Sequence, residues 1–300
     1  MATNVQKATP AGGAGSELKN FWNGFMGLSW TVKLTLVALV VLYYPVLAED
    51  AQTWVNDENQ SHGIFIIPIV LFLLWLLRDR IRAAVPAPTA FGVVLLAFGL
   101  LILVASFLLR LKLFPMLSLV PVVAGLILAL HGKNLMRVVL FPVLFLGFAA
   151  PLPDAITLPV SAAIQRASTD VSAWTMVTMG YPLVQTGNRI DTPTISVEVA
   201  EVCSGFKKLT ALIAFSFLYG YMFNIGMFKR AVLVVSAPFV ALFANVIRVC
   251  ALIFIGSTWG VGALKTAHDY AEMGVLVVAF FAFIGIGKLI GCQKLRFFQS

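Results

Sequence analysis

The chain has 300 residues, of which 60% are hydrophobic and only 11% are charged, and its mean hydropathy is +0.95. An ordinary soluble domain carries about 25% charged residues, so this composition excludes a soluble globular protein. The net charge of +8 comes from lysines and arginines scattered at the ends of apolar segments, without the basic patch of a nucleic-acid-binding protein. We therefore expect a polytopic membrane protein that has membrane lipids and no nucleic acid as partners.

Eight apolar segments have about the length that crosses a bilayer, which is near 20 residues for a helix. Lipid permits only helices or closed barrels across it, so we expect an all-α membrane bundle of about eight transmembrane helices. An N-terminal tail, 1–29, whose first 20 residues are rich in Ala, Gly, Ser and Thr, precedes the bundle, and a short tail, 292–300, follows it. The predicted spans are 30–48, 63–77, 90–109, 113–130, 135–150, 209–225, 231–255 and 271–290.

The distribution of charge along the chain predicts its orientation. If the N-terminus lies in the cytoplasm, the inner segments hold 13 of the 21 basic residues and only two of the 13 acidic residues. Because cytoplasmic loops carry an excess of lysine and arginine, both termini are expected in the cytoplasm. The segments 49–62, 151–208 and 256–270 then lie on the outer side of a cytoplasmic (inner) membrane.

The long outer segment has two parts. Pro151-Leu-Pro153 ends the fifth span, and 154–179 has the periodicity of an amphipathic helix that lies on the outer surface or dips into it. After Gly180-Tyr-Pro182, the residues 184–202 are short, alternating and interrupted by turns, which predicts a small extracytoplasmic β-ribbon. This ribbon would bring Cys203 to the membrane surface.

Cys203 is the candidate nucleophile. It stands in Val-Cys-Ser-Gly between a strand-like alternation and the next apolar span, close to Lys207 and Lys208. A cysteine at the start of a helix and near cations is favoured as the reactive thiolate, although most free cysteines are simply small buried hydrophobes. The three cysteines, at 203, 250 and 292, are far apart and have no metal-ligand spacing, so we expect neither a metal nor another cofactor.

Two further polar residues are predicted at the same outer depth. Arg248 lies in the outer third of the seventh span, three residues after Asn245, and His268 immediately precedes the eighth span. An intramembrane arginine is a candidate for function, but it could also snorkel to the rim, and a histidine at a helix start is often a cap or a solvated residue. Cysteine with histidine is the nucleophile and acid–base pair of thiol acyl transfer, and a fixed cation can hold an oxyanion.

Two more residues are weaker candidates. His62 opens the second span and could border the same outer cavity or serve a structural role. Glu201 shares a strand face with Cys203 and could orient His268 or bind a basic group of a substrate, although charges beside a ribbon are usually solvated.

These segments together resemble the exosortase/archaeosortase family of polytopic membrane cysteine transpeptidases. Ser61-His-Gly63 resembles the family's His-Gly element and Pro151-Leu-Pro153 its proline-bearing loop. The nucleophile, arginine and histidine motifs are matched by Glu198–Gly205, Asn245–Arg248 and the segment around His268, which has Asp269 where many relatives have Glu. Each motif is weak alone, but their order and their places at the span ends make the set specific.

The resemblance implies one exosortase-like membrane domain over 30–291, with Cys203 as nucleophile, Arg248 as electrostatic partner and His268 as acid–base. It also implies the substrates: exported proteins with a C-terminal sorting signal, which is a short motif (Pro-Glu-Pro in the bacterial branch), a hydrophobic helix and a basic end. The chemistry would be cleavage through a thioacyl intermediate at the outer face of the membrane.

Two other functions remain open from the sequence. A transporter or channel would use Arg248 and Asn245 to bind an anionic solute, and many transporters contain inverted repeats, which the two halves of this chain do not clearly show. A non-catalytic membrane scaffold would tolerate the loss of the Cys203 thiol.

Overall fold

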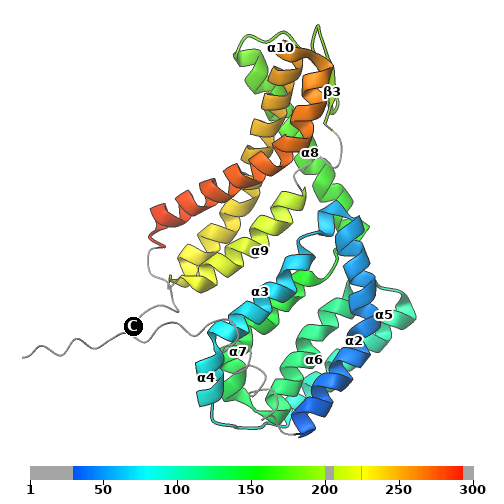
Figure 1. Cartoon of the computed structure of the whole chain (residues 1–300), viewed down its shortest axis with the longest axis vertical. Coiled ribbons are helices and arrows are strands. Elements are labelled where there is room, and N and C mark those ends of the chain that lie inside the picture. The colour runs from blue at the N-terminus through cyan, green and yellow to red at the C-terminus, as the bar shows by residue number, and fades with distance from the viewer. Residues whose placement is uncertain (1–29, 200–205, 224, 293–300) are drawn as a thin grey trace, which may run out of the picture. The chain divides into compact units, whose positions relative to one another are not determined.

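The computed structural model describes residues 30–199, 206–223 and 225–292, and of a few residues, including His268, Asp269 and Glu272, it describes the backbone alone. The chain divides into two compact units between Leu47 and Ala48, inside helix α2 (Trp30–Asn56). The second unit holds the remaining described helices and strands (Figure 1). Its α-helices are α3 (Gly63–Leu76), α4 (Arg78–Ala83), α5 (Phe91–Leu109), α6 (Phe114–Leu130), α7 (Lys133–Phe145), α8 (Asp154–Thr178), α9 (Phe206–Met222) and α10 (Met227–Ile290).

All eight predicted spans fall on helices, but the helices differ in length. Three are long and apolar enough to cross a membrane: Lys33–Asn56, Phe91–Leu109 and Met227–Leu264. A fourth span results if α7, with the 3-10 helix η2 (Leu146–Ala149), and α8 count as one broken span that bends by 82°. The other apolar helices are shorter, so the protein is helical and membrane-spanning, while the number of eight spans stays a prediction.

The seventh and eighth predicted spans form one element, α10, in which only Gly260 is non-helical, with φ 84° and ψ −179°. A residue without Cβ accepts this positive φ at no steric cost, so the helix reverses there without a loop. The prediction of a loop over 256–270 is therefore wrong, because Gly260 alone departs from helical backbone geometry there. The place of this segment on the outer side of the membrane stays a prediction. His268 lies within the helix, in the second arm of α10, rather than before its start.

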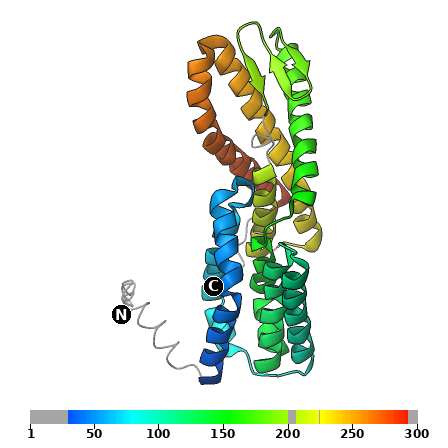
Figure 2. The ribbon, with the colours of Figure 1, turned by 90° about the vertical axis from the view of Figure 1, so that its right-hand side faces the viewer.

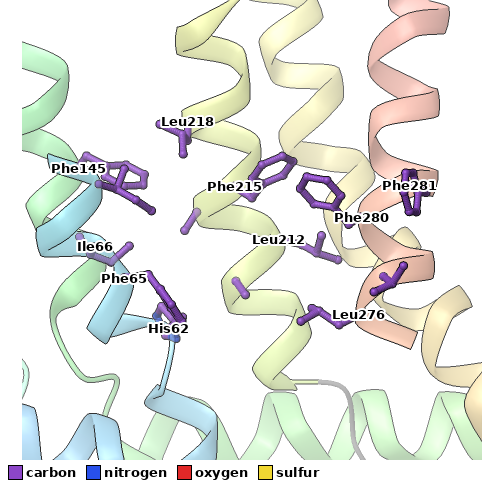
Figure 3. Close-up of a pocket in the computed structure, with 14 residues that line it drawn as sticks. His62, Phe65, Ile66, Phe145, Leu212, Phe215, Leu218, Leu276, Phe280 and Phe281 are labelled. Atoms are coloured by element: carbon purple, nitrogen blue, oxygen red, sulfur yellow. The ribbon is translucent and has the colours of Figure 1, made fainter. Parts of the chain in front are cut away.

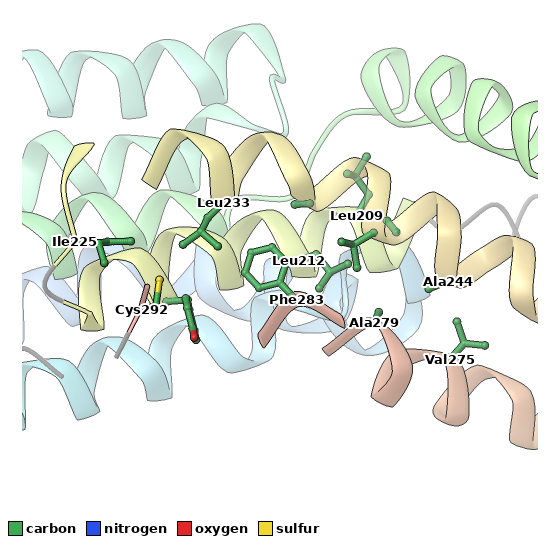
Figure 4. Close-up of a cluster of buried hydrophobic side chains, with 13 residues drawn as sticks. Leu209, Leu212, Ile225, Leu233, Ala244, Val275, Ala279, Phe283 and Cys292 are labelled. Carbon is green, nitrogen blue, oxygen red and sulfur yellow. The ribbon is translucent and has the colours of Figure 1, made fainter. Parts of the chain in front are cut away.

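A core of buried side chains joins the two arms of α10 to α9 (Figure 4). The first arm contributes small residues, Ala237, Ala241 and Ala244, which allow another helix to approach closely. Phe283 of the second arm is fully buried, and Leu212 of α9 belongs to the same cluster. This packing fastens α9, and therefore the chain that follows Cys203, to both arms of α10.

Helix α8 packs against α10. Its buried face includes Ser168, Thr169 and Ser172, all fully buried, whereas Ile156 and Val171 are exposed. The helix predicted over 154–179 is therefore confirmed, its place on the outer surface stays a prediction, and the face that meets α10 is rich in small hydroxyl side chains. Small hydroxyl side chains let two helices approach closely inside an apolar environment and offer hydrogen bonds across the contact, which explains this choice.

The residues 184–198 form a three-stranded antiparallel sheet in the order β1 (Val184–Thr186), β2 (Arg189–Asp191) and β3 (Ser196–Glu198). The register pairs Arg189 with Glu198 across β2 and β3. Gly187, with φ 62°, makes the turn between β1 and β2. Figure 2 shows the sheet beside α8, and Ile190 of the central strand is fully buried next to residues of α8 and α10.

Candidate functional site

Arg248 is almost completely buried, with 2% of its surface exposed, on the first arm of α10. It lines a cavity of about 160 Å³ together with strand β3 and Val199. Val249 and Leu252 on the first arm and Leu264 on the second arm also line this cavity. A guanidinium therefore lies in one cavity with the strand that leads to Cys203.

The residue that ends this strand is firmly anchored. The N–H of Val199 donates to the carbonyl of Asn188 at 2.9 Å, and its carbonyl accepts a hydrogen bond from Nε2 of Gln165 on α8. Its side chain is 2% exposed and packs in a cluster with Val249, the neighbour of Arg248. The chain thus leaves Val199 from a defined position beside the arginine.

The hairpin of α10 determines where the backbone of His268 lies. A Cβ at Gly256 would lie 3.5 Å from Leu264, so these two positions face each other across the bend at Gly260. Antiparallel helices with the same rise per residue then place position 268 level with Leu252, one turn from Arg248. The structure brings the backbone of His268 and the Arg248 cavity to the same level.

Cys203 and Glu201 lie outside the described residues, so their positions stay predictions. The chain that flanks them is described on both sides, by Val199 and by α9 from Phe206.

Asn245 serves the contact between two helices. Its side chain is fully buried, and its Nδ2 donates to Oγ of Ser168 on α8 at 2.9 Å. One turn further along α8, Oγ of Ser172 lies 3.5 Å from the carbonyl of Val246. Asn245 is therefore a structural neighbour of Arg248 and does not line the cavity that holds the guanidinium.

The loop that carries His62 is tied down on both sides. Nε1 of Trp54 donates to the carbonyl of Ala149 at 3.0 Å, and Gln60 exchanges two hydrogen bonds of 3.1 Å with the backbone of Leu152. Gly63 lies against the Trp54 indole, where an added Cβ would come within 2.3 Å of Nε1. The Ser61-His-Gly63 element thus needs a glycine because the tryptophan occupies the space of a side chain.

His62 reaches α9 near its start. Its Nδ1 lies 3.5 Å from Oγ1 of Thr210, four residues after Phe206. The imidazole borders two cavities, and it is the single polar side chain among the residues that line the larger one, of about 430 Å³ (Figure 3). Phe65 of α3, Phe215 of α9 and Phe280 of α10 supply much of its apolar wall. His62 is therefore close to the helix that follows Cys203.

The environment of His62 predicts a pH dependence. Burial lowers the pKa of His62 below its ordinary value, and hydrogen bonds with the backbone of Asn59 and Phe148 act in the opposite direction. The unfolded chain then binds a proton at a higher pH than the folded chain, so the free energy of unfolding falls as pH drops through about 6.5. Apparent melting temperatures in detergent, measured from about pH 8 to about pH 5.5, should show a smaller decrease for His62→Gln than for the unchanged protein.

His131 provides the control for this pH dependence. It lies between α6 and α7, and the same change there, His131→Gln, should leave the pH dependence in place. Equal slopes for His62→Gln and the unchanged protein would contradict the burial of a neutral imidazole.

The sheet carries its own polar network. Arg189 Nε contacts Asp191 Oδ1 at 2.8 Å, and the hydroxyl of Ser196 also donates to that carboxylate. Both hydrogen bonds lower the pKa of Asp191, and the bond from Ser196 has the larger effect. The network is exposed and links β2 to β3, so it maintains the strand that leads to the cavity.

Some residues of the site were not singled out by the sequence. Glu198 and Leu264 line the Arg248 cavity, and Ser168 positions Asn245. The spacing of Ser168 and Ser172, four residues apart, was the available signal, since small residues at this interval mark helix contacts in membranes. Within the described ranges, no group of three or more His, Cys, Asp or Glu residues could hold a metal ion.

One protein-family model matches most of the chain. The model described as transmembrane exosortase matches residues 54–285, which contain the His62 loop, helix α8, the sheet and the Arg248 cavity. No curated protein and no solved structure matches this chain.

Proposed function

Since the chain belongs to the transmembrane exosortase family, we propose that it is a cysteine transpeptidase or protease whose nucleophile is Cys203. Family membership and the apolar helices make it an integral membrane protein, and membership supports a membrane transpeptidase role in general. Its substrates are exported proteins that end in a hydrophobic sorting tail. It works in the cytoplasmic (inner) membrane, with both termini in the cytoplasm and the site on the outer face, an orientation that rests on the asymmetry of charge.

One observation carries this proposal: Arg248 and Val199, four residues before Cys203, line the same cavity. A buried arginine in a membrane helix is costly and is retained where it acts. The cavity supplies a partly shielded site in which a guanidinium can hold a developing oxyanion. The alignment of position 268 with Leu252 supports His268 as the third member.

The reaction begins when the Cys203 thiolate attacks the carbonyl carbon of the scissile peptide bond. Arg248 stabilises the oxyanion, the C–N bond breaks, and the departing amine takes a proton from the His268 imidazolium. The exported protein is then held as a thioester and the tail leaves. An acceptor amine or water attacks the thioester, gives a proton to His268 and releases the thiolate.

Removal of the Cys203 thiol tests this function. In Cys203→Ala, processing of a tagged reporter that carries a hydrophobic C-terminal tail should fall at least about 10³-fold, because no thioester can form. In His268→Gln, the processing rate should fall about 10²-fold or more, as expected for the loss of a general acid–base. Both rates are measured by the change in reporter size on gels, in membranes that contain equal amounts of each variant.

Cys250→Ala is the matched control for these variants. The Cys250 Sγ contacts the carbonyl of Ser172 at 3.9 Å between α8 and α10, so its loss should leave the processing rate within about twofold. Processing by Cys203→Ala at the rate of the Cys250→Ala control would exclude a thiol enzyme.

The structure gives no support to a solute transporter that uses Asn245. Its amide already donates to Ser168, and its side chain is fully buried in the contact between α8 and α10. A transported anion would need this residue accessible together with Arg248.

A further inference from the structure

Strand β3 borders the Arg248 cavity and is the last strand of the sheet. In the order β1-β2-β3, it is bonded to β2 and, among the described residues, to no strand on its other side. Two backbone hydrogen bonds show which residues of this segment point toward β2: Thr192 N–H donates to the Ile195 carbonyl, and Val199 N–H donates to the Asn188 carbonyl. In an antiparallel ladder, every second pair of opposite residues is hydrogen-bonded. The pair midway between these two, Ile190 with Val197, is therefore also hydrogen-bonded.

It follows that Ser196 and Glu198 direct their backbone N–H and C=O groups away from β2, toward the outer edge. Both residues are exposed, and no backbone hydrogen bond from the described part of the chain occupies that edge. Ser196 and Glu198 also line the cavity that contains Arg248, with Leu252 and Leu264 opposite. An edge strand of this kind is a ready template for a further strand.

We propose that this edge binds the substrate's recognition motif, the extended segment on the N-terminal side of the scissile bond, as a fourth strand. Main-chain hydrogen bonds to Ser196 and Glu198 provide affinity, and the cavity takes an alternate side chain. The inference rests on the proposed function, because the edge leads, after Val199, to the segment that contains Cys203.

The direction of the chain determines the direction of the bound peptide. Strand β3 runs from Ser196 toward Cys203, and the upstream part of the substrate must end with its carbonyl at Cys203. The substrate strand therefore runs parallel to β3, so that positions nearer the scissile bond lie beside Glu198 and positions further upstream lie beside Ser196. The hydrophobic tail, which follows the scissile bond, continues away from the sheet.

The backbone edge is tested by proline, which lacks the N–H donor and is tolerated on edge strands. Glu198→Pro should lower kcat/KM for the tailed reporter about tenfold, mainly through KM, as expected for one lost hydrogen bond. Glu198→Ala measures the part of this effect that comes from the side chain. Gln185→Pro is the matched control, since Gln185 occupies the corresponding position on the opposite edge, in β1.

The control variant loses more contacts of the fold itself, because Nε2 of Gln185 donates to Asp170 at 2.6 Å. If Gln185→Pro retains activity while Glu198→Pro loses it, the outer edge of β3 is the binding edge. If both variants have the same kcat/KM, or if Glu198→Pro and Glu198→Ala are equal, the proposal is wrong.

Direct mapping separates this inference from the chemistry. In a Cys203→Ala background, Ser196→Cys and Glu198→Cys are each oxidised with reporters that carry one cysteine at successive positions upstream of the cleavage site. A parallel strand predicts disulfides at every second position, with the Ser196→Cys pattern two residues further upstream than the Glu198→Cys pattern. The proposal is wrong if the disulfides do not alternate along the reporter, if the Ser196→Cys pattern is shifted in the opposite direction, or if the disulfides join two copies of the enzyme. The proposed function would still stand in each case if the protein with Cys203 intact processes the reporter.

Discussion

Arg248→Lys is expected to lower the rate of reporter processing about 10²-fold or more while the protein still folds. The side chain is 2% exposed in a small cavity, where a guanidinium offers several donors in a fixed plane. Lysine keeps the positive charge but presents a single ammonium that cannot direct two N–H donors at the oxyanion in the same fixed plane. Loss of one preorganised donor to an oxyanion costs about 10²–10³ in kcat.

Arg166→Lys is the matched control for Arg248→Lys. Arg166 is exposed on α8, so the same change there should leave kcat and KM within about twofold. Elution of each variant as a single species in detergent shows that it has folded. An Arg248→Lys protein that is folded and processes the reporter at the normal rate would remove Arg248 from the site.

Gly132→Ala is expected to have the largest effect on stability and to lower the free energy of unfolding by about 3–5 kcal/mol. Gly132 has φ 85°, and an added Cβ would lie 1.6 Å from the carbonyl oxygen of Ala87. That backbone cannot move aside freely, because Ala87 N–H donates to the His131 carbonyl at 2.8 Å. The variant should melt at a much lower temperature in detergent or fail to accumulate in membranes.

Gly180→Ala separates the two causes of this effect. Gly180 has φ 87°, almost the same backbone conformation, but no atom of the described residues lies within 4 Å of the position of an added Cβ. The cost there is only the strain of a left-handed residue, about 1–2 kcal/mol. If the two alanine variants melt at the same temperature, the close approach between Gly132 and Ala87 does not contribute to stability.

Much of the fold could be predicted because hydropathy and segment length are local properties. The predicted segment 90–109 became α5 (Phe91–Leu109), and 113–130 became α6 (Phe114–Leu130), within a residue at each end. Where the prediction was wrong, at 256–270, the reason is also local. A single glycine at 260 reverses the helix, which the sequence pattern does not distinguish from a loop.

The arrangement of the site could be predicted less well. The motif around Arg248 identified an intramembrane arginine, but several of its neighbours in the cavity, such as Val199, Leu252 and Leu264, carry no chemical signal of their own. For His62, the motif could not reveal the 3.5 Å approach to Thr210, because the two residues are 148 positions apart. Glu198, which begins the nucleophile motif, lines the cavity as a residue of β3, a role that depends on the pairing of β3 with β2.

Composition and apolar run length were enough to establish a helical membrane protein, and the order of its motifs was enough to point to a thiol enzyme, since both are written along the chain itself. The folded molecule alone decides that the small polar face of α8 meets α10, that position 268 returns to the level of Leu252, and that β3, as the last strand of the described sheet, lies beside Arg248. These features depend on contacts between segments far apart in the sequence, and such contacts form only when whole helices pack.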